Sequence, residues 1–260
     1  MPGAEWPQFP KTPILEMLKP DWGLVRNHRE AEGLQFRNLK LDQLQRLSEI
    51  GFANLRALSL QFLRAPDLQL LRWFPSVKQL EVWQSNKVTS LSGLEHLPDL
   101  NWLCLSELGP LPTLEPLRNC TKLESFALTG GFSKLQKLEG SHEPIATLRR
   151  LRHLMLYALR GPSDLGPLLD FPELECLHLP PAPYPLEEVA RVAARYPFYA
   201  AARPWLVPFE YDRDGCSRCG RKRTFLFLKR KRVNWCEHCD AAKLQRILNE
   251  FEALIESYRT

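Results

Sequence analysis

One short apolar phrase recurs seven times between residues 31 and 180, and this repetition limits what the chain can fold into. Each copy has apolar residues at its first, fourth and sixth positions. The copies are Ala31/Leu34/Phe36, Leu55/Leu58/Leu60, Val77/Leu80/Val82, Leu100/Leu103/Leu105, Leu123/Phe126/Leu128, Leu151/Leu154/Leu156 and Leu174/Leu177/Leu179. Their first residues are 24, 22, 23, 23, 28 and 23 positions apart. Such a period indicates a solenoid, because one unit cannot bury its apolar face alone and must stack on its neighbours.

The tandem copies resemble the leucine-rich repeat family, and the resemblance covers more than half of the chain. It implies an α/β fold, a leucine-rich repeat solenoid with a parallel concave sheet of about seven strands. In most repeats apolar residues stand three apart with Pro, Ser or Gly between them, which favours short 3₁₀ turns on the outer side. These turns resemble the short repeat class of the family, with 22–24 residues per repeat.

One position departs from the family pattern. The family usually has Asn three residues after the third apolar position, where its amide satisfies the turn backbone. In this chain the slot holds Leu63, Ser85, Leu108, Gly131 and Leu159. The asparagine ladder is absent, so the sequence leaves the curvature and regularity of the stack open.

Proline, glycine and helical periodicity divide the chain into four segments. Residues 1–30 are predicted to be an N-terminal cap, with a helix that begins at Thr12–Pro13 and ends at Pro20. Residues 31–198 form the solenoid, with a helix before Gly51 in the first repeat and an amphipathic terminal helix from Leu186. An insertion over 130–144 is expected to be an exposed loop. Residues 199–212 are predicted to be a linker and 213–260 a separate small domain.

The concave face of the predicted sheet is the candidate binding surface. Alternate strand residues point outward, and these positions are nearly uncharged. The predicted contact residues are Trp83, Trp102, Met155, Tyr157, His153 and His178. Exposed aromatic anchors are typical of a protein-binding surface. The alternative is that the tail or the long loop covers these rings.

The two histidines have a second interpretation. His153 and His178 occupy near-equivalent positions on neighbouring predicted strands, as a metal site or an acid–base pair would require. No carboxylate accompanies them in those two strands, so ordinary surface histidines are favoured.

Four cysteines in the tail have metal-ligand spacing. Cys216 and Cys219 form one Cys-x-x-Cys pair, and Cys236 and Cys239 form a second pair after sixteen residues. Four thiolates at this spacing predict a closed tetrahedral Zn²⁺ site with no open coordination position. A redox dithiol and an iron–sulfur site are the alternatives.

The order of elements around these cysteines suggests a finger type. A hairpin is predicted between the pairs, and a helix with one apolar face follows Cys239. This order resembles a treble-clef zinc finger, with spacing similar to GATA-type fingers, over about 50 residues. The resemblance implies that the same four cysteines are the ligands. Zinc would then supply the stability that so small a unit lacks.

The formal charge of the chain is concentrated in this tail. Residues 211–260 hold 12 Lys/Arg and 7 Asp/Glu, which leaves 23 of each for residues 1–210. The cations on or beside the predicted hairpin are Arg221, Lys222, Arg223, Lys229, Arg230, Lys231 and Arg232. Such a cluster can contact phosphates, so a nucleic-acid-binding protein is the alternative function. A zinc tetrathiolate would offset part of this charge.

The sequence as a whole predicts a non-enzymatic scaffold with a protein partner. No nucleophile–base arrangement or phosphate-cradling glycine loop is evident, and neither is a small-molecule substrate site. No apolar run approaches the ~18 residues of a membrane span, so no membrane partner is expected. The odd total of seven cysteines and the absence of a secretory signal favour a reducing compartment, and the expected location is the cytoplasm.

Overall fold

The computed structural model describes residues 6–131, 135–180, 184–208, 215–226 and 233–259. The chain forms two compact units. The repeat unit comprises Glu5–Pro162 with Asp170–His178, and the C-terminal unit comprises Ser163–Leu169 with Leu179–Thr260. The segment 163–178 is therefore divided, with 163–169 in the C-terminal unit and 170–178 in the repeat unit. Each unit is described by itself.

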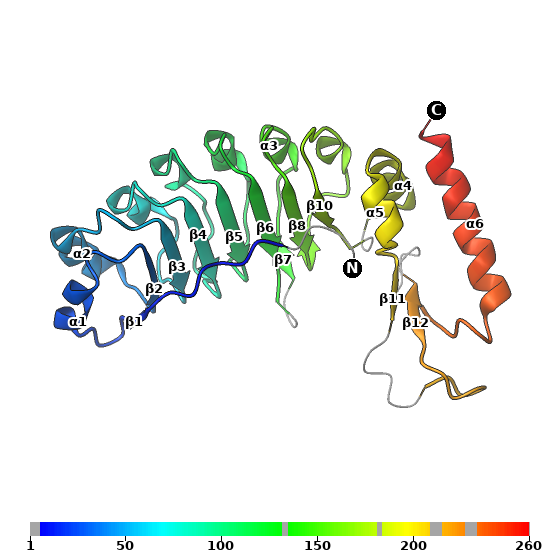
Figure 1. The fold of residues 1–260 in the computed structure, drawn as a ribbon, viewed down its shortest axis with the longest axis horizontal. Coiled ribbons are helices and arrows are strands. Elements are labelled where there is room, and N and C mark those ends of the chain that lie inside the picture. Colours follow the sequence, from blue (N-terminus) through cyan, green and yellow to red (C-terminus); the bar gives the residue numbers. More distant parts are fainter. Residues whose placement is uncertain (1–5, 132–134, 181–183, 209–214, 227–232, 260) are drawn as a thin grey trace. The chain divides into compact units, whose positions relative to one another are not determined.

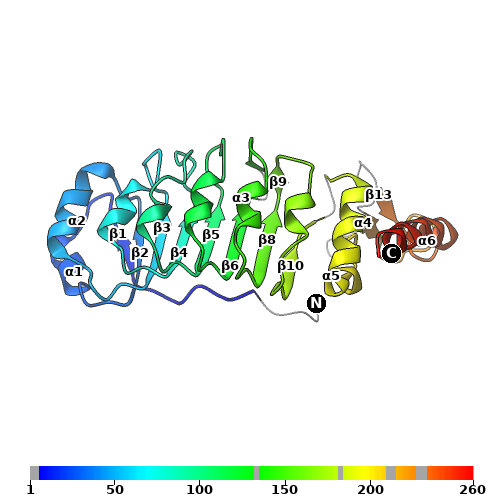
Figure 2. The same cartoon turned by 90° about the horizontal axis from the view of Figure 1, so that it is seen from above.

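The repeat unit is built on one parallel sheet, which confirms the predicted leucine-rich-repeat fold. Its strands lie side by side in the order β1-β2-β3-β4-β5-β6-β8-β10 (Figure 1 and, from above, Figure 2). The strands are β1 (Ile14–Glu16), β2 (Gly33–Arg37), β3 (Ala57–Gln61), β4 (Gln79–Trp83), β5 (Trp102–Ser106), β6 (Ser125–Thr129), β8 (His153–Tyr157) and β10 (Cys176–His178). Seven of them are the strands of the seven phrases, and β1 is an additional edge strand.

The fourth positions of the phrases form a continuous apolar row. They are register partners on successive strands, and the first six are 0% exposed, whereas the seventh, Leu177 on β10, is half-buried. The row is Leu34, Leu58, Leu80, Leu103, Phe126 and Leu154. Because the same phrase places the same side chain inward in every repeat, stacking of the repeats buries what no single repeat could.

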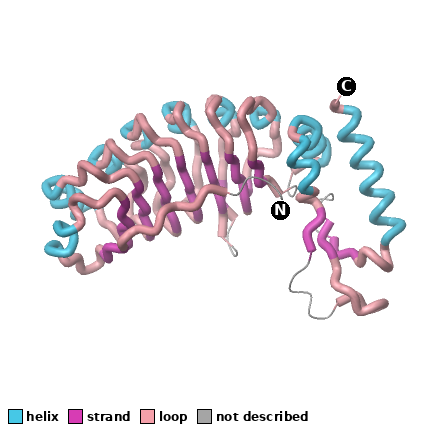
Figure 3. Tube along the Cα trace, in the orientation of Figure 1, coloured by secondary structure: helices cyan, strands magenta, loops and turns pink. Residues whose placement is uncertain are grey.

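Short helical turns lie on the outer side of the strands, as the three-residue spacing predicts (Figure 3). They are η1 (Leu41–Gln43) with α2 (Leu44–Ile50), η2 (Gln69–Trp73), η3 (Leu94–His96), η4 (Glu115–Asn119) and α3 (Glu143–Ala146). The first repeat carries the predicted α-helix, which ends at Gly51 with φ +69°. The later turns are 3₁₀ segments of three to five residues or a four-residue helix, with proline inside η4 and α3.

The turns after the strands are regular although the asparagine ladder is absent. The residue that follows a strand has a left-handed φ of 50–61° in five repeats. These residues are Asn38, Phe62, Gln84, Glu107 and Ala158. The N–H of Asn38 donates to the Gln61 carbonyl (2.8 Å), and Phe62 donates to that of Trp83 (3.1 Å). The backbone itself therefore links each turn to the next.

Two buried polar side chains provide the contact that the family asparagine would make. The Ser85 Oγ accepts a hydrogen bond from the Leu63 N–H (2.9 Å) and donates to the Trp83 carbonyl (3.0 Å). The Gln136 Oε1 accepts from the Leu108 N–H (2.9 Å). Each satisfies a buried donor from a neighbouring repeat.

Replacing Ser85 by Ala is expected to lower the free energy of unfolding by about 1–3 kcal/mol, because the buried Leu63 N–H loses its acceptor. Urea denaturation monitored by circular dichroism measures this loss. Ser48 is half-buried on α2 and its hydroxyl donates to the Gln45 carbonyl at the surface (2.6 Å), so Ser48→Ala is the matched control and should change stability by less than about 0.5 kcal/mol. Equal effects from the two substitutions would contradict the assigned role of Ser85.

The insertion over 130–144 is not simply an exposed loop. Strand β7 (Gln136–Lys137) pairs with β9 (Leu159–Arg160), and Leu138 is 3% exposed. Leu135 is exposed, as expected, and residues 132–134 lie outside the described residues. The insertion thus adds a two-stranded sheet beside the turns, and Gln136 reaches inward from it.

The N-terminal cap differs from the predicted helix at Thr12. Residues 14–16 form β1, which pairs with β2, and the helix α1 (Trp22–Asn27) begins only after Pro20. The Asp21 carboxylate caps that helix by accepting from the Gly23 N–H (2.9 Å). Leu15 and Met17 are buried, so the segment follows a two-residue period. An unpaired edge of β2 favours a strand over a helix at this place.

The C-terminal unit combines the terminal helix with the cysteine-rich tail. Its elements are η5 (Gly166–Leu168), α4 (Leu186–Arg195), α5 (Pro197–Ala202), β11 (Leu206–Pro208), β12 (Thr224–Leu226), β13 (Val233–Trp235) and α6 (Ala241–Ser257). The predicted hairpin β12–β13 and the predicted helix α6 are present. The segment 199–212, predicted as a linker, contains the end of α5 and also β11, which pairs with β12.

Aromatic packing and hydrogen bonds hold this unit together. The Phe251 ring of α6 lies 4.8 Å from the ring of Trp205, which lies 6.2 Å from that of Tyr199 on α5. The Tyr196 hydroxyl donates to the Leu168 carbonyl (2.9 Å), which ties the α4–α5 corner to η5. The elements η5, α4 and α5 therefore share one core with Trp205 and α6.

Candidate metal centre and concave face

The four predicted ligands come together in the C-terminal unit. Cys216 and Cys219 lie in the turn before β12, and Cys236 and Cys239 lie between β13 and α6. Their four sulfur atoms all lie within 4.8 Å of one another. The Sγ atoms of Cys216 and Cys239 are 3.9 Å apart, and those of Cys219 and Cys236 are 3.5 Å apart. A tetrahedral metal with bonds of about 2.3 Å to sulfur requires sulfur atoms about 3.8 Å apart, so the donor set fits such an ion.

Tight backbone turns aim the paired sulfurs at one point. The Gly220 N–H donates to the Cys216 carbonyl (2.7 Å), and the Asp240 N–H donates to the Cys236 carbonyl (2.8 Å). Gly215 has φ +63°, and a Cβ atom there would lie 2.5 Å from the Gly220 carbonyl oxygen. Only glycine fits at position 215, so the sequence dictates the first turn.

The electrostatics of the cluster favour a cation at its centre. The pKa of Cys216 is lowered to about 6 because the Arg218 N–H donates to its sulfur. The pKa of Cys239 is raised to about 12, first because its thiol donates a hydrogen bond to Cys219. Four sulfurs this close cannot all carry negative charge unless a positive ion balances them.

An ion pair that the sequence did not reveal links the two cysteine pairs. The Arg218 Nη2 donates to the Asp240 Oδ1 (2.6 Å), and the Asp240 Oδ2 accepts from the Cys236 N–H (3.1 Å). Arg218 lies inside the first pair and Asp240 directly follows the second. Only their adjacency to the ligands could have suggested the contact.

The basic cluster is described in part. Arg221 and Lys222 are exposed and Arg223 is half-buried. Lys229, Arg230, Lys231 and Arg232 lie outside the described residues. The predicted contact with nucleic acid stays a prediction.

The concave face of the repeat unit has an open row and a covered row. The last residues of the strands form the open row, in which Trp83 is 37% and Tyr157 45% exposed, whereas Gln61 of β3 is 4% exposed. Phe62, which follows β3, is 38% exposed beside this row. Met155 lies between the rows and is half-buried. The first residues of the strands form the covered row, to which Trp102 and His153 belong.

Trp102 was expected to be exposed on this face, and the structure corrects that expectation. Its side chain faces outward from β5 but is only 6% exposed. The cover is the N-terminal segment. The Trp102 ring lies 6.4 Å from that of Trp6 and 5.4 Å from that of Phe9, and its indole N–H donates to the Pro7 carbonyl (3.1 Å). No local pattern connects residues so distant in sequence.

The two histidines of the face have separate partners. The His153 Nδ1 is 3.0 Å from the Ser125 Oγ, and its ring contacts Trp6. The His178 ring lies 5.5 Å from that of Tyr157. Burial lowers the pKa of both histidines below the usual value, so both are neutral at neutral pH. The geometry matches two packed side chains rather than a catalytic pair.

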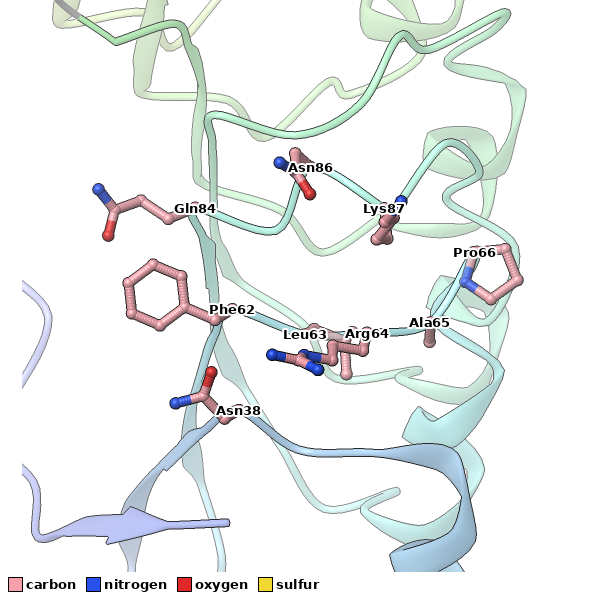
Figure 4. A pocket seen from close by; sticks show the side chains of 9 residues that line it. All are labelled: Asn38, Phe62, Leu63, Arg64, Ala65, Pro66, Gln84, Asn86 and Lys87. Atoms are coloured by element: carbon pink, nitrogen blue, oxygen red, sulfur yellow. The ribbon is translucent and has the colours of Figure 1, made fainter. Parts of the chain in front are cut away.

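An open hollow of about 570 Å³ lies where β2, β3 and β4 end. It is lined by Asn38, Phe62, Leu63, Arg64, Ala65, Pro66, Gln84, Asn86 and Lys87. Figure 4 shows the side chains of Asn38, Phe62 and Gln84 projecting on one side of the turns. The hollow therefore lies next to the open row, on the turns that follow the strands.

Within the described part of the chain, no helix is long and apolar enough to cross a membrane.

Comparison with known proteins finds similarity among solved structures alone. No family model and no curated protein matches the sequence. An internalin of Listeria monocytogenes, InlF, is 22% identical with a TM-score of 0.47, over 62% of this chain and 43% of that one. Internalin C2 of the same organism is 22% identical with a TM-score of 0.46, over 60% of this chain and 64% of that one. The chain thus spans less than two thirds of the length of either protein.

Proposed function

We propose that the protein is a non-enzymatic interaction scaffold that binds a segment of a protein partner on its concave face. The observation that carries the proposal is the exposure of Trp83 and Tyr157 in the open row and of Phe62 beside it, each more than a third exposed. Large rings on a rigid sheet bring contact area at low entropic cost, which makes them the usual anchors of protein interfaces.

The spacing of the anchors suits an extended segment. Trp83 and Tyr157 are register-equivalent residues three strands apart, a separation of about 14 Å. Between them lie Ser106 and Thr129, whose hydroxyls bond to each other (2.9 Å). A partner strand of four or five residues would cover this distance, with aromatic contacts at its ends and polar ones between.

Recognition rather than catalysis also agrees with the titratable groups of the face. The pKa of Cys104 is raised to about 12 by burial and by Glu81, so its thiol is protonated at neutral pH. The two neutral histidines are occupied in separate contacts. A four-cysteine centre would leave its metal no open position for water.

We further propose that the ion of the C-terminal unit is zinc and that the fold around it is a treble clef. The support is the four-sulfur donor set and the order of cysteine turn, hairpin and helix. Zinc is the usual ion of closed tetrahedral thiolate sites and would act structurally. Reduced thiolates of this kind agree with a cytoplasmic location, which remains part of the proposal.

Replacing Trp83 by Ala is expected to reduce retention of the native partner at least tenfold, because an exposed anchor ring is lost. Tagged full-length protein is incubated with extract of the native cell, and retained proteins are quantified by mass spectrometry. Trp73 is 40% exposed on the outer turn η2, so Trp73→Ala is the matched control and should retain the partner like the wild type.

The melting temperature separates binding from folding. Trp83→Ala should melt like the wild type, and a large drop would assign the ring to internal packing. Equal retention by the two tryptophan variants would contradict the proposed surface. Loss of retention after nuclease treatment would instead favour nucleic-acid binding through the basic tail.

A further inference from the structure

The segment that covers Trp102 has the sequence spacing of a polyproline II helix. Pro7, Pro10 and Pro13 stand three residues apart, and residues 6–13 belong to no helix or strand. Trp6, Phe9 and Thr12 are half-buried, as is Pro7, whereas Gln8, Pro10 and Lys11 are exposed. A three-residue period of burial matches the three residues per turn of polyproline II.

The path of the segment agrees with that conformation. Trp6 contacts both Trp102 on β5 and His153 on β8, so it lies near β6, and Thr12 lies against Gly33 on β2. Four strand spacings separate β6 from β2, about 19 Å. Six residues of polyproline II also span about 19 Å. The segment therefore has the rise of a polyproline helix. The dark blue trace in Figure 1 shows it crossing the strands.

Side chains, rather than a strand ladder, hold this segment on the sheet. Trp6 and Phe9 pack on the Trp102 ring, and the Trp102 indole N–H donates to the Pro7 carbonyl. An aromatic platform with one indole donor to a proline-segment carbonyl is the chemistry by which aromatic grooves recognise polyproline segments. Gly33 leaves room for the Thr12 side chain, since a Cβ atom at position 33 would lie 2.6 Å from the Thr12 Cγ2.

We propose that residues 6–12 are an exchangeable occupant of a polyproline-recognition groove on the concave face. The partner is an extended, proline-rich segment of another protein with aromatic side chains three residues apart, and it binds by displacing residues 6–12. This inference rests on the proposed function, since it names the class of partner that the concave face takes.

The anchoring of the segment explains why it can leave without loss of the fold. The ladder of β1 with β2 begins where the Pro13 carbonyl accepts from the Gln35 N–H (2.9 Å), so displacement stops there. A tethered occupant has an effective concentration of about millimolar. An external segment therefore competes with it, and weakening the occupant should strengthen external binding.

The test uses a fluorescent peptide with the sequence of residues 6–13 and the full-length protein. The double variant Trp6→Ala/Phe9→Ala should bind the peptide at least tenfold more tightly than the wild type, as fluorescence anisotropy measures. The double variant Gln8→Ala/Lys11→Ala changes the exposed side of the same segment and should bind like the wild type. A peptide with Ala in place of its Trp and Phe should not bind.

The groove itself is tested at Trp102. Within the Trp6→Ala/Phe9→Ala protein, Trp102→Phe keeps a ring but removes the donor to the Pro7 carbonyl, and it should weaken peptide binding several-fold. Circular dichroism melting confirms that each variant is folded. Unchanged peptide binding in the Trp102→Phe protein would overturn the assigned groove.

Two further outcomes would overturn the inference. One is equal or undetectable peptide binding by the wild type and the Trp6→Ala/Phe9→Ala protein. The other is that the wild type is a dimer and the Trp6→Ala/Phe9→Ala protein is a monomer. Residues 6–12 would then bind the concave face of a second copy of the chain. If peptide binding fails while Trp83→Ala still reduces partner retention, the inference fails alone. If peptide binding fails and Trp83→Ala also leaves partner retention unchanged, both the inference and the proposed function fail.

Discussion

Replacing Cys216 by Ser is expected to remove the metal and to unfold the tail of the C-terminal unit. Three sulfurs would remain where four now lie within 4.8 Å of one another. Structural zinc supplies about 10–16 kcal/mol of apparent binding free energy in small modules, so its loss exceeds the stability of a typical domain. Metal content by plasma mass spectrometry should fall from about one ion per chain to near zero.

Hydrogen exchange locates the accompanying unfolding. The amides of α6 and of the hairpin β12–β13 should lose protection in Cys216→Ser, whereas those of β3 to β6 should keep it. Cys176 is half-buried on β10, so Cys176→Ser is the matched control and should retain the ion. A Cys216→Ser protein that still holds one ion, or that keeps α6 protected, would refute the role of the cluster.

Replacing Phe251 by Ala is expected to lower the free energy of unfolding of the C-terminal unit by about 3–5 kcal/mol. Phe251 is 1% exposed, and its ring meets the Trp205 ring edge-on at 4.8 Å. Removing it leaves a cavity among α4, α6 and Trp205, and the aromatic contact is lost as well. The readout is the urea dependence of hydrogen exchange at α6 amides.

An exposed phenylalanine in the same unit provides the comparison. Phe198 on α5 is 36% exposed, and Phe198→Ala should cost less than about 1 kcal/mol. If Phe198→Ala destabilises α6 as much as Phe251→Ala does, the shared aromatic core is not what holds the helix.

The repeat architecture was predictable because one phrase carries two periods at once. Its fourth and sixth residues alternate inward along a strand, and the whole phrase returns after about 23 residues. Leu80 and Val82 illustrate the result, since both are 0% exposed. The four metal-ligand candidates were predictable for a similar reason, because Cys-x-x-Cys spacing fixes two sulfurs on one turn.

The remaining features depend on contacts that no local pattern encodes. Apolar residues at 14, 15, 17 and 18 fit a helix or a strand, and the unpaired edge of β2 decided between them. Trp6 and Trp102 are 96 positions apart, so their contact is invisible in any window of sequence. β11 has three residues and ends in Pro208, which is too short and too irregular to predict a strand.

The way the C-terminal unit recruits residues 163–169 has a consequence for dividing the chain. The Leu165 N–H donates to the Glu188 carboxylate (2.8 Å), and the Leu168 carbonyl accepts from Tyr196. Residues 170–178 then return to the sheet of the repeat unit. A cut near residue 180 would separate η5 from α4 and remove both of these hydrogen bonds. Residues 163–169 would then remain on the repeat unit without their partners. The chain therefore has no clean domain boundary near residue 180.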